Sequence, residues 1–354
     1  HEFIYSGLDL RTETISGLYS KTIQHTTTYP QPVGEQPYTT SMIRTIDVGP
    51  TSQSLSDYSG VYSYDIWGRL NKVQGPGIVG SETLGAGVGY SYKPGTDLVQ
   101  SVSHLMSFDQ TFGGSTRLYD STRGLVTSVE NSWNGGDPGQ LTTKSKYVHE
   151  YDLLNRRKYV IRTGSEFSQN HTDAWDYNFR NELTSSIQKP GTDPYAQVAP
   201  VTGRSLGYTY DSIGNRATST VDSDATNYVS NNVNQYTSKT GASPESFGPH
   251  DLDGNIQTDG TYTYKWDAQN RLTEVYPTTQ PNNSIKLTFS YDYMGRRVTR
   301  KTFIRTGGAW PTIATTDIRF VYDGWNVIME LDGRDNDLNG QPDNTVLRKY
   351  TWGL

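Results

Sequence analysis

Aromatic and polar residues alternate in short stretches along the chain, as in Tyr62-Ser-Tyr64 and Tyr208-Thr-Tyr210. Each stretch is followed by Asp, two variable residues, Gly or Asn, and Arg, after which apolar residues resume, as in Leu272-Thr-Glu-Val275. Residues two apart in a strand point to the same face, so this alternation predicts strands with one buried face. Two such strands joined by a short polar segment are typical of a β-hairpin.

This phrase recurs along most of the chain, which indicates an internal repeat. Its second aromatic residue falls at positions 64, 119, 151, 177, 210, 266, 291 and 322. The separations are 25 to 33 residues, except for two of 55 and 56 residues, where we expect degenerate copies near Tyr92 and Tyr236. The sequence therefore predicts an all-β fold of repeated antiparallel β-hairpins.

Each residue type in the phrase has a physical role in a tight turn. The Asp carboxylate can accept backbone N–H groups, and the Gly or Asn supplies the left-handed conformation that closes a type I turn with a bulge. The Arg guanidinium can pair with the turn Asp or lie on an aromatic ring of the adjacent hairpin. The predicted structural repeat residues are Tyr64, Asp65, Gly68, Arg69, Tyr151, Asp152, Asn155, Arg156, Tyr210, Asp211, Gly214, Arg216, Trp266, Asp267, Asn270, Arg271, Tyr291, Asp292, Gly295 and Arg296.

Composition agrees with an ordered, tyrosine-rich β protein. The 354 residues include 26 Tyr, 7 Trp, 35 Gly and 16 Pro, which suits pleated sheets joined by tight turns. The formal charge of −6 gives no bias toward nucleic acid. Cysteine is absent, which excludes disulfides, thiolate metal sites and cysteine nucleophiles. No apolar run approaches the roughly 18 residues of a membrane span.

At these residues the chain resembles the RHS or YD-repeat proteins of bacteria, whose animal relatives include the teneurins. The resemblance rests on the copies of Tyr-Asp-x-x-Gly-Arg, and on Asp253-Gly-Asn255 leading into Tyr264-Lys-Trp266-Asp267. It covers residues 58–354, the predicted hairpin-repeat region. Residues 1–57 match poorly, and we expect a strand-rich segment there that continues the same sheet.

The resemblance implies hairpins laid side by side in a long curved or spiralling sheet, part of an RHS-type shell. In bacterial toxin systems such a shell encloses a C-terminal toxic domain, and other family members are cell-surface or adhesive proteins. A segment rich in Pro and Asp normally closes the shell, and none precedes Leu354. We therefore expect this chain to be a section of a larger polypeptide, with any toxin or cargo outside it.

One loop has the spacing of a calcium site. Asp335, Asp337, Asn339 and Asp343 occupy loop positions 1, 3, 5 and 9, with Gly340 at position 6. The loop resembles the short calcium loops of thrombospondin- and dockerin-type modules, although Val346 stands where an EF-hand has Glu. An ordinary polar hairpin loop is the alternative, because Asp, Asn and Gly also dominate turns. Calcium is the only cofactor considered, and none is required.

Two sequence patterns suggest a catalytic site, but a structural role explains each of them better. Gly203-Arg-Ser205-Leu-Gly207 matches the Gly-x-Ser-x-Gly elbow of serine hydrolases, but a repeat hairpin begins where the elbow needs a helix. The turn carboxylates could be glycosidase acids, yet they recur once per hairpin, whereas catalytic pairs are unique. We therefore predict no catalytic residue and no enzyme activity.

The sequence thus favours a non-enzymatic structural repeat region of a larger exported RHS/YD-repeat protein, forming shell wall or scaffold around a C-terminal toxin or cargo. The alternative is a cell-surface or extracellular adhesin or filament component whose exposed tyrosines bind glycans or proteins. An all-β carbohydrate-active enzyme ranks below both. The expected partners are the rest of the same polypeptide or other copies of the chain, and the expected location is the exterior of a bacterium, secreted or on the surface.

Overall fold

A computed structural model describes residues 2–6, 9–15, 21–28, 41–48, 58–75, 86–106, 110–135, 140–241, 243–336, 340 and 342–353. Within these residues all regular secondary structure is β-strand. The described part contains no helix long and apolar enough to span a bilayer. The predicted all-β fold class is confirmed, and so are its repeated antiparallel hairpins.

The chain divides into two compact units: a first unit of residues His1–Gly207 with Thr351–Leu354, and a second unit of residues Tyr208–Tyr350. The predicted division into 1–57 and 58–354 follows the repeat motif and stays a prediction.

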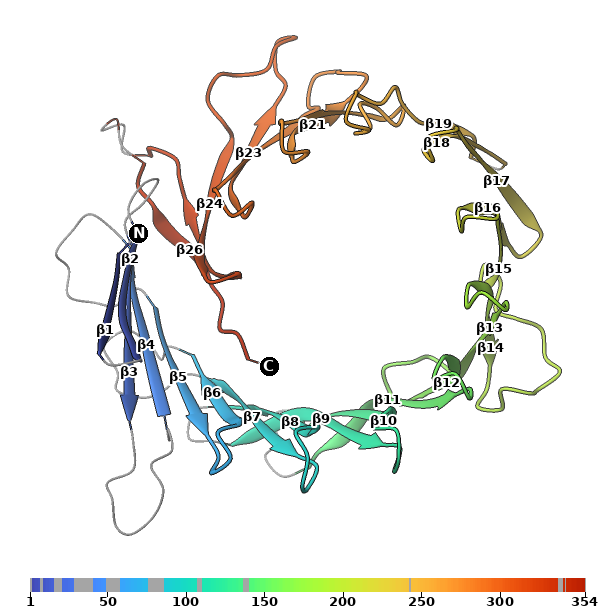
Figure 1. Cartoon of the computed structure of the whole chain (residues 1–354), viewed down its shortest axis with the longest axis horizontal. Helices are drawn as coiled ribbons and strands as arrows, with labels where there is room; N and C mark the ends of the chain where they lie inside the picture. Colours follow the sequence, from blue (N-terminus) through green and yellow to red (C-terminus); the bar gives the residue numbers. More distant parts are fainter. Residues whose placement is uncertain are drawn as a thin grey trace. The chain divides into compact units, whose positions relative to one another are not determined.

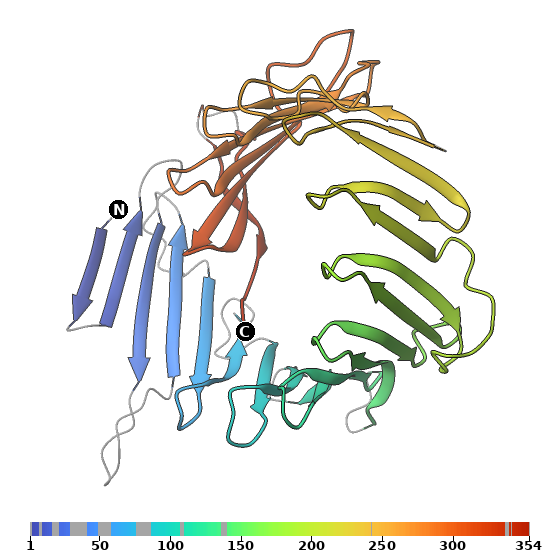
Figure 2. The same cartoon turned by 45° about the vertical axis from the view of Figure 1, so that its right-hand side comes forward.

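The strands of the first unit are β1 (Glu2–Ser6), β2 (Asp9–Ile15), β3 (Lys21–Thr28), β4 (Ser41–Val48), β5 (Tyr58–Tyr64), β6 (Leu70–Gln74), β7 (Gly87–Tyr92), β8 (Val99–Leu105), β9 (Thr111–Tyr119), β10 (Val126–Trp133), β11 (Thr142–Tyr151), β12 (Arg157–Thr163), β13 (His171–Tyr177) and β14 (Leu183–Pro190). Each pairs antiparallel with the next. Figures 1 and 2 show this succession from blue to green. The strand β15 (Ser205–Tyr210) crosses the boundary between the units.

The strands of the second unit are β16 (Arg216–Val221), β17 (Asp224–Ser230), β18 (Tyr236–Thr240), β19 (Glu245–Ser246), β20 (Tyr262–Trp266), β21 (Leu272–Pro277), β22 (Ile285–Tyr291), β23 (Arg297–Ile304), β24 (Thr316–Asp323), β25 (Asn326–Asp332) and β26 (Thr345–Lys349). Antiparallel pairing runs in chain order through β16–β19 and again through β20–β26.

Fully buried apolar side chains are scarce in the described part and concentrate in β24 and β25. Of nine buried hydrophobic residues, six lie in these two strands: Phe320, Val321, Tyr322, Ile328, Met329 and Leu331. The other three are Val73, Leu105 and Val160. Most other strand residues are half-buried, so hydrophobic burial alone holds the hairpins together weakly. The polar chemistry of the turns therefore matters for the fold.

Candidate functional site in the repeated turns

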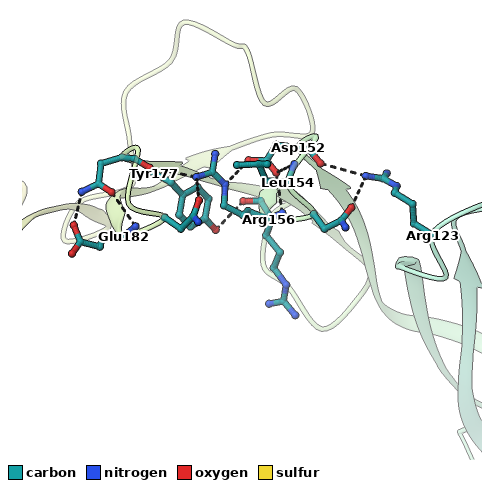
Figure 3. A network of polar contacts seen from close by, with 10 residues as sticks. Arg123, Asp152, Leu154, Arg156, Tyr177 and Glu182 are labelled. Carbon is teal, nitrogen blue, oxygen red and sulfur yellow. Dashed lines mark hydrogen bonds and ion pairs between the residues drawn. The ribbon is translucent and has the colours of Figure 1, made fainter. Parts of the chain in front are cut away.

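The turn between β11 and β12 shows how the repeat residues close a hairpin (Figure 3). The Asp152 N–H donates to the Arg156 carbonyl at 2.9 Å, and the Asn155 N–H donates to the Asp152 carbonyl at 3.1 Å. The Asp152 Oδ1 atom accepts the N–H groups of Leu154 and Arg156, both at 2.9 Å. Asn155 adopts the left-handed conformation with φ of 64°, and the strand register shifts just before the turn. The carboxylate thus caps the turn from within, as an Asx-turn does.

Arg156 links this turn to the next hairpin. Its Nε donates to Asp152 Oδ2 at 2.6 Å, while Nη1 donates to Asn181 Oδ1 at 2.9 Å. The guanidinium also lies 4.6 Å from the ring centroid of Tyr177 in β13. The arginine therefore does both things that the sequence left as alternatives: it pairs with its own turn Asp and lies on the neighbouring aromatic ring. In the same way Arg123 reaches from the preceding turn to Asn155 Oδ1 at 3.1 Å (Figure 3).

The neighbouring aromatic residue completes the link with a hydrogen bond in the opposite direction. Tyr177 donates its hydroxyl proton to the backbone carbonyl of Arg157, at 3.0 Å, at the start of the preceding return strand. The Arg156 guanidinium therefore lies on the ring of the next hairpin, and the hydroxyl of that ring donates a hydrogen bond back to the strand after Arg156. We call this reciprocal arrangement the turn ladder.

The turn ladder recurs in both units. Arg69 pairs with Asp65 and lies over Tyr92, Arg271 pairs with Asp267 and lies over Tyr291, and Arg296 pairs with Asp292 and lies over Tyr322. The ring-to-carbonyl hydrogen bonds join Tyr92 to Leu70, Tyr119 to Val99, Tyr151 to Val126, Tyr177 to Arg157, Tyr236 to Arg216, Trp266 to Ile256, Tyr291 to Leu272 and Tyr322 to Arg297.

This bond gives a physical reason for the residue type at the second aromatic position. A phenol O–H or an indole N–H can donate to the carbonyl, whereas phenylalanine carries no donor. Trp266 makes the bond with its indole Nε1 at 2.8 Å. The excess of Tyr over Phe in the composition, 26 against 9, therefore follows at least in part from the ladder.

The turn that follows β15 departs from the predicted pairing. Asn215 Nδ2 donates to Asp211 Oδ2 at 2.9 Å and also to Asn234 Oδ1 of the next turn. Arg216, one residue later, lies 4.6 Å from the ring of Tyr208 in its own hairpin. The structure thus gives the linking role to Asn215 and not to Arg216, because the residue four positions after the Asp is the one that faces its carboxylate.

Two further turns have an amide four residues after the capping residue, at the position that Arg occupies in most copies of the phrase. Asn231 caps the turn between β17 and β18 and bonds to Gln235 Oε1 at 2.9 Å, in the gap where a degenerate copy was expected near Tyr236. The turn that contains Asp253 and Asn255, named for the resemblance but not counted among the repeats, is capped by Asp251, whose Oδ2 accepts Asn255 Nδ2 at 3.0 Å. The signal that could have found both is an Asp or Asn followed four residues later by an amide. A search for Arg alone overlooks it.

In the turn between β13 and β14 the capping residue is Asn178, and the residue four positions later is an acid, Glu182, in place of Arg. Asn178 Oδ1 accepts the backbone N–H groups of Arg180 and Glu182, and its Nδ2 donates to Glu182 Oε2 at 2.6 Å. Arg180 pairs with the same carboxylate at 2.9 Å. Glu182 therefore holds its own turn together but carries no donor with which to reach another hairpin.

The pKa values of several ladder members are shifted in the direction that favours their hydrogen-bonded form. Desolvation tends to raise the pKa of Asp152, but hydrogen bonds from the backbone and side chain of Arg156 and from the Leu154 N–H outweigh it, so this pKa is lowered. The same opposition lowers the pKa of Asp267. Burial raises the pKa of the Tyr177 and Tyr291 hydroxyls. These shifts favour the charged carboxylate and the protonated hydroxyl at the four positions, as the ladder requires.

The residues of the calcium hypothesis are only partly within the described part. Asp337 and Asn339 lie outside it. Asp335 Oδ2 accepts the Gly340 N–H at 2.8 Å, and Asp343 Oδ2 accepts the Asn336 side-chain amide at 2.7 Å. Among the residues that the structure describes, no three His, Asp or Glu side chains are grouped as a metal site would need. The calcium site stays a prediction.

Ser205, the candidate nucleophile, is the first residue of β15. A strand begins there in place of the helix that a nucleophile elbow requires. The carboxylates considered as glycosidase acids, such as Asp65, Asp152 and Asp267, cap turns and pair with arginines of the same turn.

Part of the chain is similar in sequence to known proteins. No family model matches the chain. Over 154 residues, 43% of the chain, it is 32% identical to the tRNA3(Ser)-specific nuclease WapA of Bacillus spizizenii and to the tRNA nuclease WapA of Bacillus subtilis strain 168. The chain is similar to RHS and YD-repeat proteins. The matched part is 6% of each WapA protein, so the nuclease named there describes a much longer protein.

Two solved structures align with most of this chain at low identity and low TM-score. The TcdB2-TccC3 crystal structure aligns with 88% of this chain and 20% of its own, at 10% identity and a TM-score of 0.39. The Tc holotoxin pore of Photorhabdus luminescens aligns with 91% of this chain and 20% of its own, at 11% identity and a TM-score of 0.37.

Proposed function

We propose that the chain is a non-enzymatic structural section of a larger exported bacterial RHS/YD-repeat protein, forming wall or scaffold around a C-terminal toxin or cargo that lies outside this chain. The observation that carries the proposal is the turn ladder. Its charged and aromatic groups are repeated hairpin after hairpin and are engaged with one another, as expected of residues that hold a wall together. The similarity to WapA supports the proposal. WapA is named as a tRNA nuclease, and the part that matches this chain is 6% of its length, so most of WapA lies outside the matched section.

The proposal is tested on the native full-length polypeptide. We expect protease treatment to leave a resistant fragment that contains this section and protects the remainder of the protein. Arg156→Ala with Tyr177→Phe should open the ladder and make the protected part cleavable. Lys146→Ala serves as the control, because its ammonium pairs with Glu130 on a strand, at 3.0 Å, and not in a turn. The enclosing role would be refuted if protease cleaved the rest of the polypeptide equally fast in the native protein and in the double variant.

The absence of enzyme activity has its own test. The isolated 354-residue chain should leave tRNA intact under conditions in which the full-length protein cleaves it. Cleavage by the isolated chain at a comparable rate would show that the chemistry resides here, and the structural proposal would then fail.

A pocket in the first unit favours the alternative of a surface protein that binds glycans or proteins. Its volume is about 210 Å³, and it is lined by Arg162, Asp173, Trp175, Ser186, Gln188, Arg204 and Leu206. Asp173 is 6% exposed and is held by Arg162 at 2.7 Å and by Gln188 at 2.8 Å. An indole beside guanidinium, amide and hydroxyl groups suits a sugar or a short peptide. Loss of glycan binding in Trp175→Ala, with the urea midpoint unchanged, would support this function.

A further inference from the structure

The pocket of the first unit lies on one face of four neighbouring strands, β12 to β15 (Figure 1). Trp175 in β13 is paired with Ser186 in β14, and Ser186 is paired with Leu206 in β15. Residues directly opposite each other in antiparallel strands share a face, so the three side chains form a row across the sheet. A small serine between an indole and a leucine leaves a hollow, and the pocket there has a volume of about 210 Å³.

A second row, of polar side chains, borders this hollow. Asp173 is paired with Gln188, whose N–H donates to the Arg204 carbonyl at 3.0 Å. Residues two apart in a strand share a face, so this row lies beside the first. The Gln188 amide donates to Asp173 Oδ1 at 2.8 Å, and Arg162 Nε lies 2.7 Å from Asp173 Oδ2. The carboxylate of the pocket is therefore held on both oxygens and balanced by one guanidinium.

The second arginine leaves the pocket with excess positive charge. Two guanidinium groups and one carboxylate line it, which gives a formal charge of +1. Within the described part of the chain, the exposed Arg204 side chain has no ion pair and no hydrogen bond. Arg162 contacts Asp173 through Nε, and its two terminal nitrogens have no partner among the same residues. Guanidinium groups with open N–H edges are the preferred partners of carboxylates.

The other lining groups suit a sugar ring. Trp175 and Leu206 are two strands apart, about 10 Å, and offer apolar surface to the C–H face of a ring. The Ser186 hydroxyl and Gln188 Oε1 make no hydrogen bond within the described part, so both are available to ring hydroxyls. The volume is below the roughly 300–1,000 Å³ of sites for drug-sized ligands. The pocket therefore has room for one ring and not for a longer segment of a glycan.

A peptide fits this place less well. Each of β13 and β14 is hydrogen-bonded to a strand on both sides, so neither offers an open edge to which a peptide strand could add. An acidic side chain of a peptide could reach Arg204, but it carries no ring to cover the Trp175 indole. Charge and shape together favour a ligand that is both a ring and an acid.

We propose that this pocket binds a sugar ring that carries a carboxylate, as a uronic acid unit of a glycan does. The Trp175 indole packs against the ring, and Arg204 binds the carboxylate together with the terminal nitrogens of Arg162. The inference rests on the glycan-binding alternative proposed above and adds the class of glycan. It is independent of the enclosing role.

Two probes that differ in one substituent test the charge. Methyl β-D-glucuronide carries a carboxylate where methyl β-D-glucopyranoside carries a hydroxymethyl group. Titration of the 354-residue chain, followed by ligand-observed NMR, should show the glucuronide binding at least about tenfold more tightly, because hydrogen bonds between charged groups are stronger than neutral ones. Equal affinities would overturn the proposal and leave a neutral-glycan site, so the glycan-binding alternative would still stand.

Variants separate the carboxylate contact from the ring contact. Arg204→Gln should reduce the preference for the glucuronide to about threefold or less. Arg157→Gln is the matched control, because Arg157 is an exposed arginine of β12 that does not line the pocket, and the preference should be unchanged. Trp175→Ala should weaken both probes by at least about fivefold, and Trp175→Phe by less, since phenylalanine retains a ring. An unchanged preference in Arg204→Gln would overturn the proposal.

A third probe, acetyl-glutamate amide, represents an acidic peptide. It should bind at least about tenfold more weakly than the glucuronide, because it lacks the ring. Equal binding of these two acids would overturn the proposal in favour of a peptide ligand. Binding of neither sugar at millimolar concentration would overturn both the proposal and the glycan-binding alternative, and the protease test would still decide the enclosing role by itself.

Discussion

The ring-to-carbonyl bond of the ladder can be removed without removing the ring. In Tyr291→Phe the Arg271 guanidinium, 4.9 Å from the ring centroid, keeps its aromatic partner, but the 2.7 Å bond to the Leu272 carbonyl is lost. A hydrogen bond contributes about 0.5–1.5 kcal/mol net, and a half-buried carbonyl left without its donor adds to the loss. We expect the free energy of unfolding of the second unit to fall by about 1–2 kcal/mol.

Removing the ring as well separates the two contributions. Tyr291→Ala also deletes the apolar contact and the cation–π interaction with Arg271, which contributes about 0.5–1 kcal/mol at such a site. The total loss should reach about 3 kcal/mol, at the lower end of what truncating a buried aromatic residue costs. Tyr291→Phe should therefore lose about one to two thirds of the stability that Tyr291→Ala loses.

Hydrogen exchange read by mass spectrometry measures where the loss falls. In both variants, peptides from β21 and β22 should exchange faster, while peptides from the first unit should be unchanged, because each hairpin depends on its neighbours. Tyr293→Phe is the matched control, since Tyr293 lies two residues away at the turn tip and is 81% exposed. The reasoning is refuted if Tyr293→Phe and Tyr291→Phe have equal effects, or if exchange rises uniformly over the whole chain.

Three further outcomes follow from the turns, and a fourth tests the calcium loop. Gly295 has φ of 81° and open space around it, so Gly295→Val should cost about 1–2 kcal/mol from backbone strain alone and Gly295→Asn much less, as measured by urea denaturation. The pKa of Asp152 is lowered in the fold, so its contribution is present above the unfolded-state pKa near 4 and is lost as pH falls further. Asp152→Asn should flatten the fall of the urea midpoint below about pH 4. The Tyr177 pKa is raised, so its contribution is lost as pH rises above about 10, and Tyr177→Phe should flatten that loss. Calorimetry with millimolar calcium should show heat of binding that Asp337→Ala removes, and no heat with the unmodified chain would contradict the calcium site.

Local turn chemistry was readable from the sequence because it depends on residues only a few positions apart. An Asp that caps two N–H groups and a Gly or Asn with positive φ need only the chain between Asp65 and Arg69, or between Asp152 and Arg156. The same period predicted the hairpins near Tyr92 and Tyr236 although their turns lack the Asp–Arg pair. Strand pairing in chain order then followed from repetition.

Contacts between hairpins were not readable in the same way, because they join residues 10 to 32 positions apart. The sequence left two roles open for the arginine, and only the packed sheet shows that Arg156 fills both at once. It also gave the linking role to Arg216, whereas the strand geometry turns that side chain to Tyr208 and brings Asn215 to the carboxylate.

What the sequence determined by itself is therefore the unit of construction: an aromatic strand, a capped turn and a return strand, repeated. What only the tertiary structure decided is how each unit is used. The donor at the second aromatic position finds its acceptor in a carbonyl of the preceding hairpin, and an arginine reaches the next turn only when the strands pair in register. Both depend on distances across the sheet, which the spacing of residues along the chain does not contain.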